Sequence, residues 1–314
     1  MKIRISIFIG LVAGIIAGCT GINRDPYSDT PTTGIISIGV DETFRPVADA
    51  ELLVFEGLYQ YAKITPIYSS ESQCFKLLME DSVRLIIASR PLYENEKTSL
   101  QKRQIIPREI KIAVDAIAVI ANPGNADTLL SLKQVREILT GNVTEWKQIS
   151  QQSALGKIEV IFDNKNSSIL RYLLDSLCSG TTLSSQLYAL DSNIDVVNYI
   201  ANHLNAIGFI GVSWISDQDD TTQMSFLNRI HVIALSEKNQ ATSDNSYKPY
   251  QAYIYQGIYP LSRNVYAINT EPRNGLATGV MSFLASDKGQ KIILKSGIVP
   301  ATAPVRLVKI RDRF

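Results

Sequence analysis

The sequence predicts an α/β protein with two lobes. From residue 34 onward, buried-strand runs alternate with segments whose apolar residues recur at helical spacing, which is typical of βα units and parallel-rich sheets. A chain of 314 residues is long enough for two domains. An extended run at 111–121 and a second at 252–268 would let the chain enter a second lobe and return. We therefore expect a ligand between the lobes, beyond the carboxyl ends of the strands.

The elements follow in a regular order. Short apolar runs predict strands at 34–40, 64–68, 83–88, 111–121, 158–162 and 207–212. Apolar residues at helical spacing predict helices at 46–63, 71–80, 132–139, 170–177, 195–203, 276–284 and 290–294. Ser131 and Asp195 are expected to cap two of these helices. The crossings divide the body into one lobe of residues 34–117 and 256–314 and another of 118–255.

The first residues carry an export signal. Lys2 and Arg4 precede an apolar run at 5–16, and small residues lead directly to Cys19. This ending resembles the bacterial lipobox, which implies removal of 1–18 and acylation of Cys19. An ordinary signal peptide with an incidental cysteine is the alternative. Residues 19–33 are polar and contain Pro and Gly, so we expect a flexible tether and an exported, membrane-anchored lipoprotein facing the periplasm or the cell exterior.

Composition excludes several classes of protein. A net charge of +1 without a Lys/Arg-rich stripe argues against nucleic-acid binding. Cys74 and Cys178 could form one bridge, but two buried free thiols are the expected state. Two histidines and no Cys/His cluster predict neither a metal site nor a cofactor, and they disfavour a histidine-dependent triad.

Four turns could hold an anion. Residues 41–46, 69–70 and 166–168 each lead from a strand into a helix and carry hydroxyl side chains. A helix start presents unpaired N–H groups and partial positive charge, which favour an anion. In a fourth turn, Arg90 follows Ser89 at the end of a strand and could offer two parallel N–H donors. Helix caps and a surface ion pair are the alternative interpretations.

Five segments together suggest a family. They are DAIAVIANPGN at 115–125, SLKQVREILTGNVTEWKQI at 131–149, AIGFIGV at 206–212, YPLSRNVY at 259–266 and FLASDKGQKIILKSGIVP at 283–300. From about 34 to 300 the chain resembles the phosphate-binding proteins of bacterial ABC transporters, in the type II periplasmic binding protein superfamily. The resemblance implies two Rossmann-like lobes joined by two hinge strands. It also implies a monomer that is not an enzyme and that passes an oxyanion, phosphate first, to a transporter permease.

The resemblance also implies site residues. Each of the four turns supplies two of them: Thr43 and Phe44, Ser69 and Ser70, Ser89 and Arg90, and Ser167 and Ser168.

Acidic residues depart from the family pattern. Asp41 and Glu42 stand where relatives carry small residues, and Asp163 lies near the place of an arginine. Unpaired carboxylates would repel a dianion. A carboxylate acceptor could instead select hydrogen phosphate, which carries a proton, over sulfate.

Two other functions stay open. A surface lipoprotein of the same fold could bind a different small ligand or a protein partner. An exported hydrolase is the more remote alternative, because Ser99 and Lys102 have the spacing of a Ser-Lys pair.

Overall fold

The structure is a computed structural model that describes residues 28–184, 186–216, 228–302 and 304. Cys19 and the predicted signal segment lie outside the described residues.

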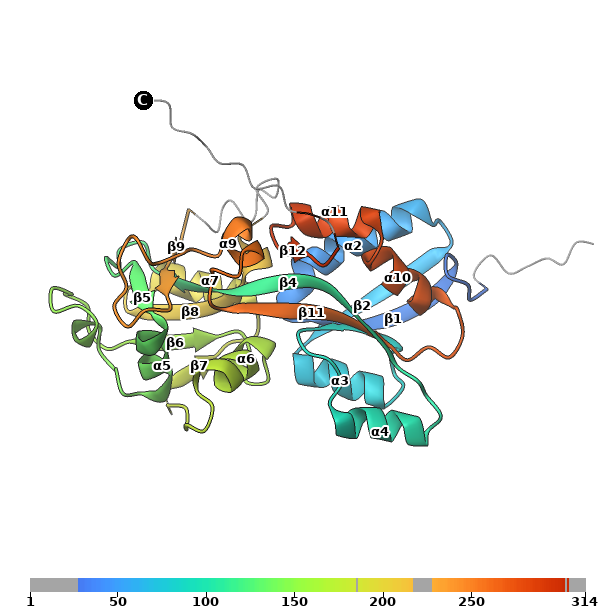
Figure 1. The fold of residues 1–314 in the computed structure, drawn as a ribbon, viewed down its shortest axis with the longest axis horizontal. Helices are drawn as coiled ribbons and strands as arrows, with labels where there is room; N and C mark the ends of the chain where they lie inside the picture. The colour runs from blue at the N-terminus through green and yellow to red at the C-terminus, as the bar shows by residue number, and fades with distance from the viewer. Residues whose placement is uncertain (1–27, 185, 217–227, 303, 305–314) are drawn as a thin grey trace, which may run out of the picture.

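The first lobe is a sheet covered on both faces by helices. Its strands, in the order β2-β1-β3-β11-β4, are β2 (Ala62–Ser69), β1 (Gly34–Asp41), β3 (Leu85–Ala88), β11 (Ser262–Asn269) and β4 (Arg108–Ala121), with β12 (Val299–Pro300) also pairing β4. The first three strands run parallel, whereas β11 is antiparallel to β3 and β4. One face carries α2 (Arg45–Leu58), α10 (Leu276–Leu284) and α11 (Asp287–Lys295), and the other carries α3 (Glu71–Met79) and α4 (Glu94–Lys102) (Figure 1).

The second lobe repeats this layered arrangement. Its strands are β8 (Ala206–Gly211), β6 (Glu159–Phe162), β7 (Leu187–Ala189) and β9 (His231–Val232), with a separate pair of β5 (Leu129–Ser131) and β10 (Ala234–Ser236). Its helices are α5 (Leu132–Thr140), α6 (Ser168–Leu177), α7 (Asn193–Asn202) and the short α9 (Gln251–Tyr255). Three 3₁₀ turns complete the described elements: η1 (Glu42–Phe44), η2 (Trp146–Gln148) and η3 (Val212–Trp214).

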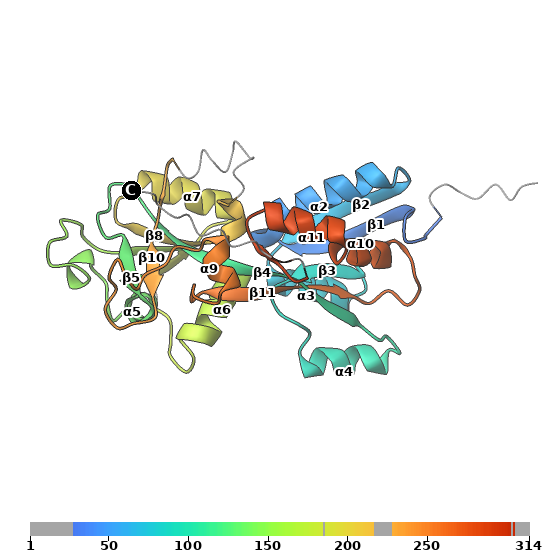
Figure 2. The same ribbon diagram turned by 45° about the horizontal axis from the view of Figure 1, so that its top comes forward.

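One strand belongs to both lobes. β4 pairs with β11 over residues 108–116 and with β8 over residues 117–121, so a continuous backbone ladder connects the lobes. Figures 1 and 2 show β4 and β11 side by side in the middle of the molecule. The prediction of two α/β lobes joined by two strands is confirmed. The exact residue boundaries of the lobes stay a prediction.

Local chemistry explains why the predicted elements form. In β4 the apolar residues from Ala116 to Ala121 are fully buried, as a strand shared by two lobes requires. Ser131 caps α5 by accepting the N–H of Gln134 at 3.1 Å, and Gly141, at φ +78°, ends that helix in a left-handed conformation. Cys74 and Cys178 are buried free thiols, as expected.

Three predicted elements differ from the structure. The run at 252–268 is not one strand: it begins with α9, and β11 starts only at Ser262 after Gly257 turns at φ +68°. Ser192, not Asp195, caps α7, because its side chain accepts the N–H of Asp195. The helix expected at 46–63 ends at Leu58.

The last residues of the predicted tether lie against the first lobe. Asp29 accepts the N–H of Leu276, at the start of α10, at 2.9 Å. Thr30 and Thr33 hydrogen bond across a tight turn, and Gly279 of α10 faces the carbonyl oxygen of Pro31. Residues 28–33 therefore have a defined position, whereas a flexible tether over 19–27 stays a prediction. None of the helices in the described ranges is long and apolar enough to cross a membrane.

Candidate ligand-binding site

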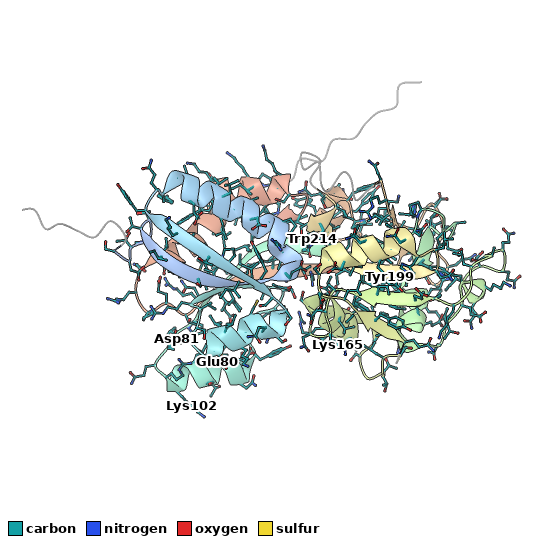
Figure 3. All side chains as sticks on the ribbon, turned by 180° about the vertical axis from the view of Figure 1, so that it is seen from behind. Glu80, Asp81, Lys102, Lys165, Tyr199 and Trp214 are labelled. Atoms are coloured by element: carbon teal, nitrogen blue, oxygen red, sulfur yellow. The ribbon has the colours of Figure 1, made fainter. Side chains whose placement is uncertain are left out.

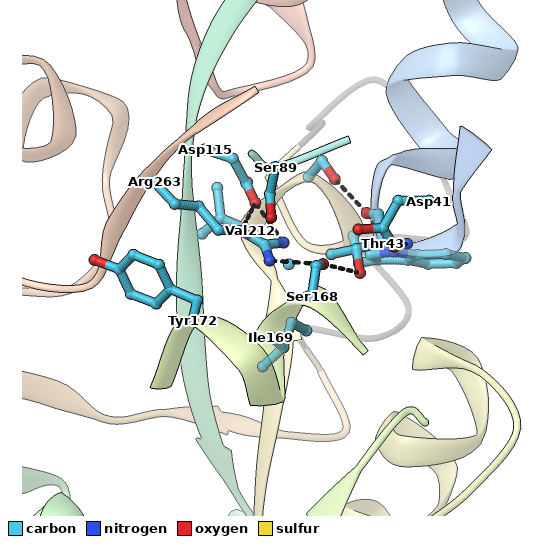
Figure 4. A network of polar contacts seen from close by, with 12 residues as sticks. Asp41, Thr43, Ser89, Asp115, Ser168, Ile169, Tyr172, Val212 and Arg263 are labelled. Carbon is cyan, nitrogen blue, oxygen red and sulfur yellow. Dashed lines mark hydrogen bonds and ion pairs between the residues drawn. The ribbon is translucent and has the colours of Figure 1, made fainter. Parts of the chain in front are cut away.

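Helix-start turns from opposite lobes meet at the centre of the molecule. Thr43 lies in η1, directly after β1, and Ser168 is the first residue of α6. Both side chains are buried, and their hydroxyl oxygens are 3.4 Å apart (Figure 4). Two of the predicted anion turns thus face each other across the junction of the lobes.

A buried arginine of β11 donates a hydrogen bond to one of these two hydroxyls. Arg263 of β11 donates from Nη1 to the Ser168 hydroxyl at 2.8 Å, and from Nε and Nη2 to Asp115 Oδ2 at 3.1 and 3.0 Å. Arg263 and Asp115 are register partners on β11 and β4. Burial raises the pKa of Asp115 and the Arg263 charge opposes this shift. The Phe44 ring lies beneath the guanidinium, 5.0 Å from its carbon.

A second arginine joins the lobes from α6. Arg171 Nε donates to Glu71 Oε2 at 2.5 Å, and Arg171 Nη2 donates to the Ser89 hydroxyl at 2.8 Å. Ser89 donates its backbone N–H and its hydroxyl to Glu71 Oε1, at 2.9 and 2.7 Å. Although burial alone would raise the pKa of Glu71, Arg171 and Ser89 hold it below its ordinary value. Glu71 is therefore ionised at neutral pH.

The residues described so far, Thr43, Ser168, Arg263, Asp115, Arg171, Glu71 and Ser89, form the central cluster. Three further carboxyl groups surround this cluster. Asp41 accepts the N–H of Thr43 at 3.1 Å, and burial followed by the Glu71 charge raises its pKa to about 7. Burial also raises the pKa of Glu42 to about 7 and moves that of Asp163 upward. Among the described residues, Asp41 Oδ2, Asp115 Oδ1 and Asp163 Oδ1 are buried without a hydrogen-bond partner. The cluster therefore contains acceptors as well as donors.

The backbone of Thr43 itself contacts the second lobe. Its carbonyl oxygen accepts Trp214 Nε1 at 3.0 Å, and Figure 3 shows Trp214 at the junction of the lobes. Asn193 Nδ2, at the start of α7, donates to Glu42 Oε2 at 2.5 Å. Gly211 leaves no room for a side chain here, because a Cβ atom would lie 2.5 Å from Thr43 Cγ2.

The structure brings four of the eight predicted site residues together: Thr43, Phe44, Ser89 and Ser168. The other four make local contacts. The Ser69 hydroxyl lies 3.3 Å from Cys74 Sγ, and the Ser70 hydroxyl lies 3.3 Å from that of Ser72.

Ser167 and Arg90 are the remaining two. Ser167 accepts the N–H of Ile169 as the cap of α6. Arg90 forms a bidentate pair with Glu96, both bonds 2.8 Å, and its guanidinium lies between the rings of Phe75 and Tyr93. This is the ion-pair interpretation of Arg90 that the sequence left open.

The sequence reasoning missed the charged residues that organise the cluster: Arg263, Asp115, Arg171 and Glu71. One signal was available for the first pair. Asp115 lies in the apolar run at 111–121 and Arg263 in the extended run at 252–268; both are buried in the structure, and buried charges require partners. Arg171 gave no such signal, because charged residues are common on the exposed face of any helix.

The arrangement suits recognition of a small polar solute. It offers hydroxyl and guanidinium donors from both lobes together with carboxyl acceptors, in a buried setting where such contacts are strong. Two cavities, of about 820 and 750 Å³, lie away from these residues, one lined by α2 and α10 and the other by residues around α9 and the end of α11.

Comparisons with known proteins show the family and the fold. Residues 25–288 match the family model described as PBP superfamily domain. The phosphate-binding protein PstS of Staphylococcus aureus is 23% identical over 94% of this chain and 88% of its own length. A putative phosphate ABC transporter substrate-binding protein with bound phosphate from Clostridium perfringens superposes with a TM-score of 0.71, at 21% identity, over 86% of this chain and all of that one.

An ABC-type phosphate transport receptor from Vibrio cholerae gives a TM-score of 0.62 at 20% identity, over 85% of this chain and all of the receptor. These likenesses confirm the type II periplasmic binding protein fold and the resemblance read from the sequence motifs. The family model covers most of the chain, including every residue of the central cluster. The chain therefore belongs to the PBP superfamily.

Proposed function

We propose that this protein is a lipid-anchored solute-binding protein that captures an oxyanion, with inorganic phosphate as the first candidate, for an ABC importer. The family match supports a binding role, and the similarity to phosphate-binding proteins of other bacteria supports this ligand class. The role requires no bond to be made or broken. The protein acts as a monomer, and a transporter permease is its partner.

The observation that carries the proposal is the meeting of Thr43, Ser168 and Arg263. The two hydroxyls come from helix starts in opposite lobes, and the guanidinium adds a buried positive charge. An oxyanion that replaces their direct contacts with one another would receive charge-assisted hydrogen bonds from both lobes at once. Binding would then favour the form in which the lobes touch, which is the basis of hinge closure about β4 and β11.

The carboxyl groups refine the ligand class. Asp41 lies against Thr43 and Glu42 against Asn193, and the pKa of each is raised to about 7. A carboxylate here can accept a proton-bearing ligand oxygen, whereas it repels an oxygen without a proton. Phosphate carries a proton at neutral pH and sulfate does not, so we expect phosphate to bind more tightly than sulfate.

Isothermal titration calorimetry on the purified protein tests this function. Phosphate is expected to bind, sulfate to bind at least about tenfold more weakly, and Ser168→Ala to weaken phosphate binding about tenfold or more, because a hydrogen bond to a charged group is lost. Ser72→Ala removes an exposed hydroxyl of α3 and serves as the matched control. Phosphate, sulfate and other small oxyanions are each tested at millimolar concentration. If none of them gives a heat of binding or raises the melting temperature, the oxyanion proposal is wrong.

The membrane anchor has its own test. Acylation of Cys19 predicts that metabolic labelling with palmitate marks the wild-type protein in its native host. Cys19→Ala is expected to abolish the label and release the protein from the membrane fraction. Equal labelling of both forms would contradict the anchor.

A second candidate function follows from the acidic residues. Five carboxyl groups surround two arginines in the cluster, namely Asp41, Glu42, Glu71, Asp115 and Asp163. This balance would suit a ligand that brings its own donors, such as a hydroxyl-rich or cationic solute. Native mass spectrometry of the protein as purified distinguishes the two, because a co-purified non-anionic ligand would favour this candidate.

The hydrolase interpretation has no comparable support. Ser99 and Lys102 are both exposed on α4. A nucleophile pair requires desolvation and a shaped pocket to be activated.

A further inference from the structure

The carboxylate of Glu71 accepts hydrogen bonds from donors that a bound oxyanion would also use. It is the first residue of α3 and its side chain is buried. One of its oxygens accepts the N–H and hydroxyl of Ser89, and the other accepts Arg171 Nε. A backbone N–H, a hydroxyl and a guanidinium are the donor types that a bound phosphate or sulfate receives in proteins.

This contact differs from the other buried ion pair of the cluster. Arg263 and Asp115 lie opposite each other on paired strands, so the sheet ladder holds them together. Glu71 lies in α3 of the first lobe and Arg171 in α6 of the second lobe. These two helices are not held together by a sheet ladder. Separation of the lobes would therefore break the Glu71–Arg171 pair and leave the Arg263–Asp115 pair intact.

Glu71 also has the right charge for this role. Arg171 and Ser89 hold its pKa below the ordinary value, so it is a carboxylate at neutral pH. Asp175, one helical turn along α6, also pairs with Arg171 at 3.1 Å. Arg171 thus keeps a partner when Glu71 is replaced, and the variant can fold.

We propose that Glu71 is a built-in competitor for the bound anion: its carboxylate occupies Ser89 and Arg171, and an incoming oxyanion must displace it. Competition of this kind lowers the affinity for the ligand, because part of the ligand's interaction replaces one already present. It also stabilises contact between the lobes, because a negative group of the chain holds Arg171 against Ser89. The inference rests on the proposed oxyanion function and adds the residue that sets its affinity.

Replacement of Glu71 by glutamine tests the proposal. Glu71→Gln keeps the shape and removes the charge, so calorimetry is expected to show phosphate binding tightened about tenfold or more. Adding Arg171→Ala in the same chain is expected to abolish this gain, because the released donor is gone. Glu96→Gln makes the same change in the Arg90–Glu96 pair within the first lobe, and it is expected to change the affinity less than about twofold. Should Glu71→Gln fail to fold, Glu71→Asp shortens the same carboxylate and is expected to give a smaller gain.

Small-angle scattering gives a readout that does not depend on the ligand. After dialysis, Glu71→Gln is expected to have a larger radius of gyration than the wild type, and phosphate is expected to reduce it. Phosphate binding by the wild type with equal or weaker binding by Glu71→Gln would overturn the inference and leave the proposed function standing. If no oxyanion binds either protein, the proposed function fails and the inference, which rests on it, fails with it.

Discussion

Two buried glutamates show how partners decide the state of a side chain. Glu71 is buried among donors from both lobes and is ionised. Glu51 of α2 is 1% exposed, faces a small cavity lined mostly by apolar residues, and has no hydrogen-bond partner for either oxygen within the described ranges. Burial raises the pKa of Glu51 to about 9, so it is neutral at pH 7.

An apolar residue at position 51 is therefore expected to stabilise the protein. Glu51→Met removes two unpartnered polar atoms and keeps a similar volume, so the free energy of unfolding should rise by about 1–3 kcal/mol at pH 7. Glu51→Gln keeps polar atoms at the same place and should stay within about 0.5 kcal/mol of the wild type. Urea denaturation measures both, and a loss of stability in Glu51→Met would contradict the explanation.

Asp41 predicts a pH dependence of stability. Its pKa is raised to about 7 in the folded protein, whereas the unfolded chain loses this proton near pH 4. At this group the folded state therefore binds more protons, and the contribution of Asp41 to the free energy of unfolding falls as pH rises from about 4 to 7. In Asp41→Asn the fall between pH 5 and pH 7 should be smaller by about 1 kcal/mol or more. Parallel slopes for both proteins in urea denaturation series would refute this.

At the scale of elements, α10 serves as a platform for residues 28–33. A Cβ atom on Gly279 would lie 1.7 Å from the carbonyl oxygen of Pro31, so Gly279→Ala is expected to displace this segment and break the Asp29 contact to Leu276. We expect faster proteolysis near residue 30 and a loss of about 1–2 kcal/mol of stability. Gly57→Ala, where a Cβ would meet nothing within 4 Å, is the matched control and should leave both unchanged or slightly stabilise α2.

The sequence predicted the elements that have a clear apolar pattern and missed those without one. β1, β4, β8 and α5 were predicted nearly to their ends because burial on both faces, or on one helical face, dictates their composition. α4 was missed because Leu100 is its one buried residue, which leaves no periodic signal. α9 was read as strand because its five residues are too few to display a helical period.

At the scale of the whole molecule, the two lobes must approach closely. Gly211 ends β8, and a Cβ atom there would lie 2.5 Å from the Thr43 side chain of the other lobe. Gly211→Ala is expected to hold the lobes apart, weaken phosphate binding about tenfold or more, and increase the radius of gyration in solution. Gly156→Ala, with a nearest contact of 3.8 Å in the second lobe, is the control. Unchanged affinity in Gly211→Ala would show that this approach plays no part in binding.

The candidate site was predictable only as far as local rules extend. Thr43 and Ser168 were found because helix starts after strands have a recognisable sequence. Arg171 and Glu71 are 100 positions apart in the chain, and their pairing exists only once both lobes are assembled. Arg90 was predicted by the same local rules as Thr43. In the structure, however, it pairs with Glu96, the third residue of α4.

The attachment of residues 28–33 makes the two lobes mechanically unequal. Asp29 joins the incoming chain to α10, so any pull along the chain from before residue 28 reaches the first lobe. The second lobe is attached through β4 and the chain leading into β11. Under the proposed anchoring and hinge closure, the first lobe would stay with the anchored end of the chain while the second lobe moves. The load between them would then pass through β4 and β11, where Asp115 pairs with Arg263.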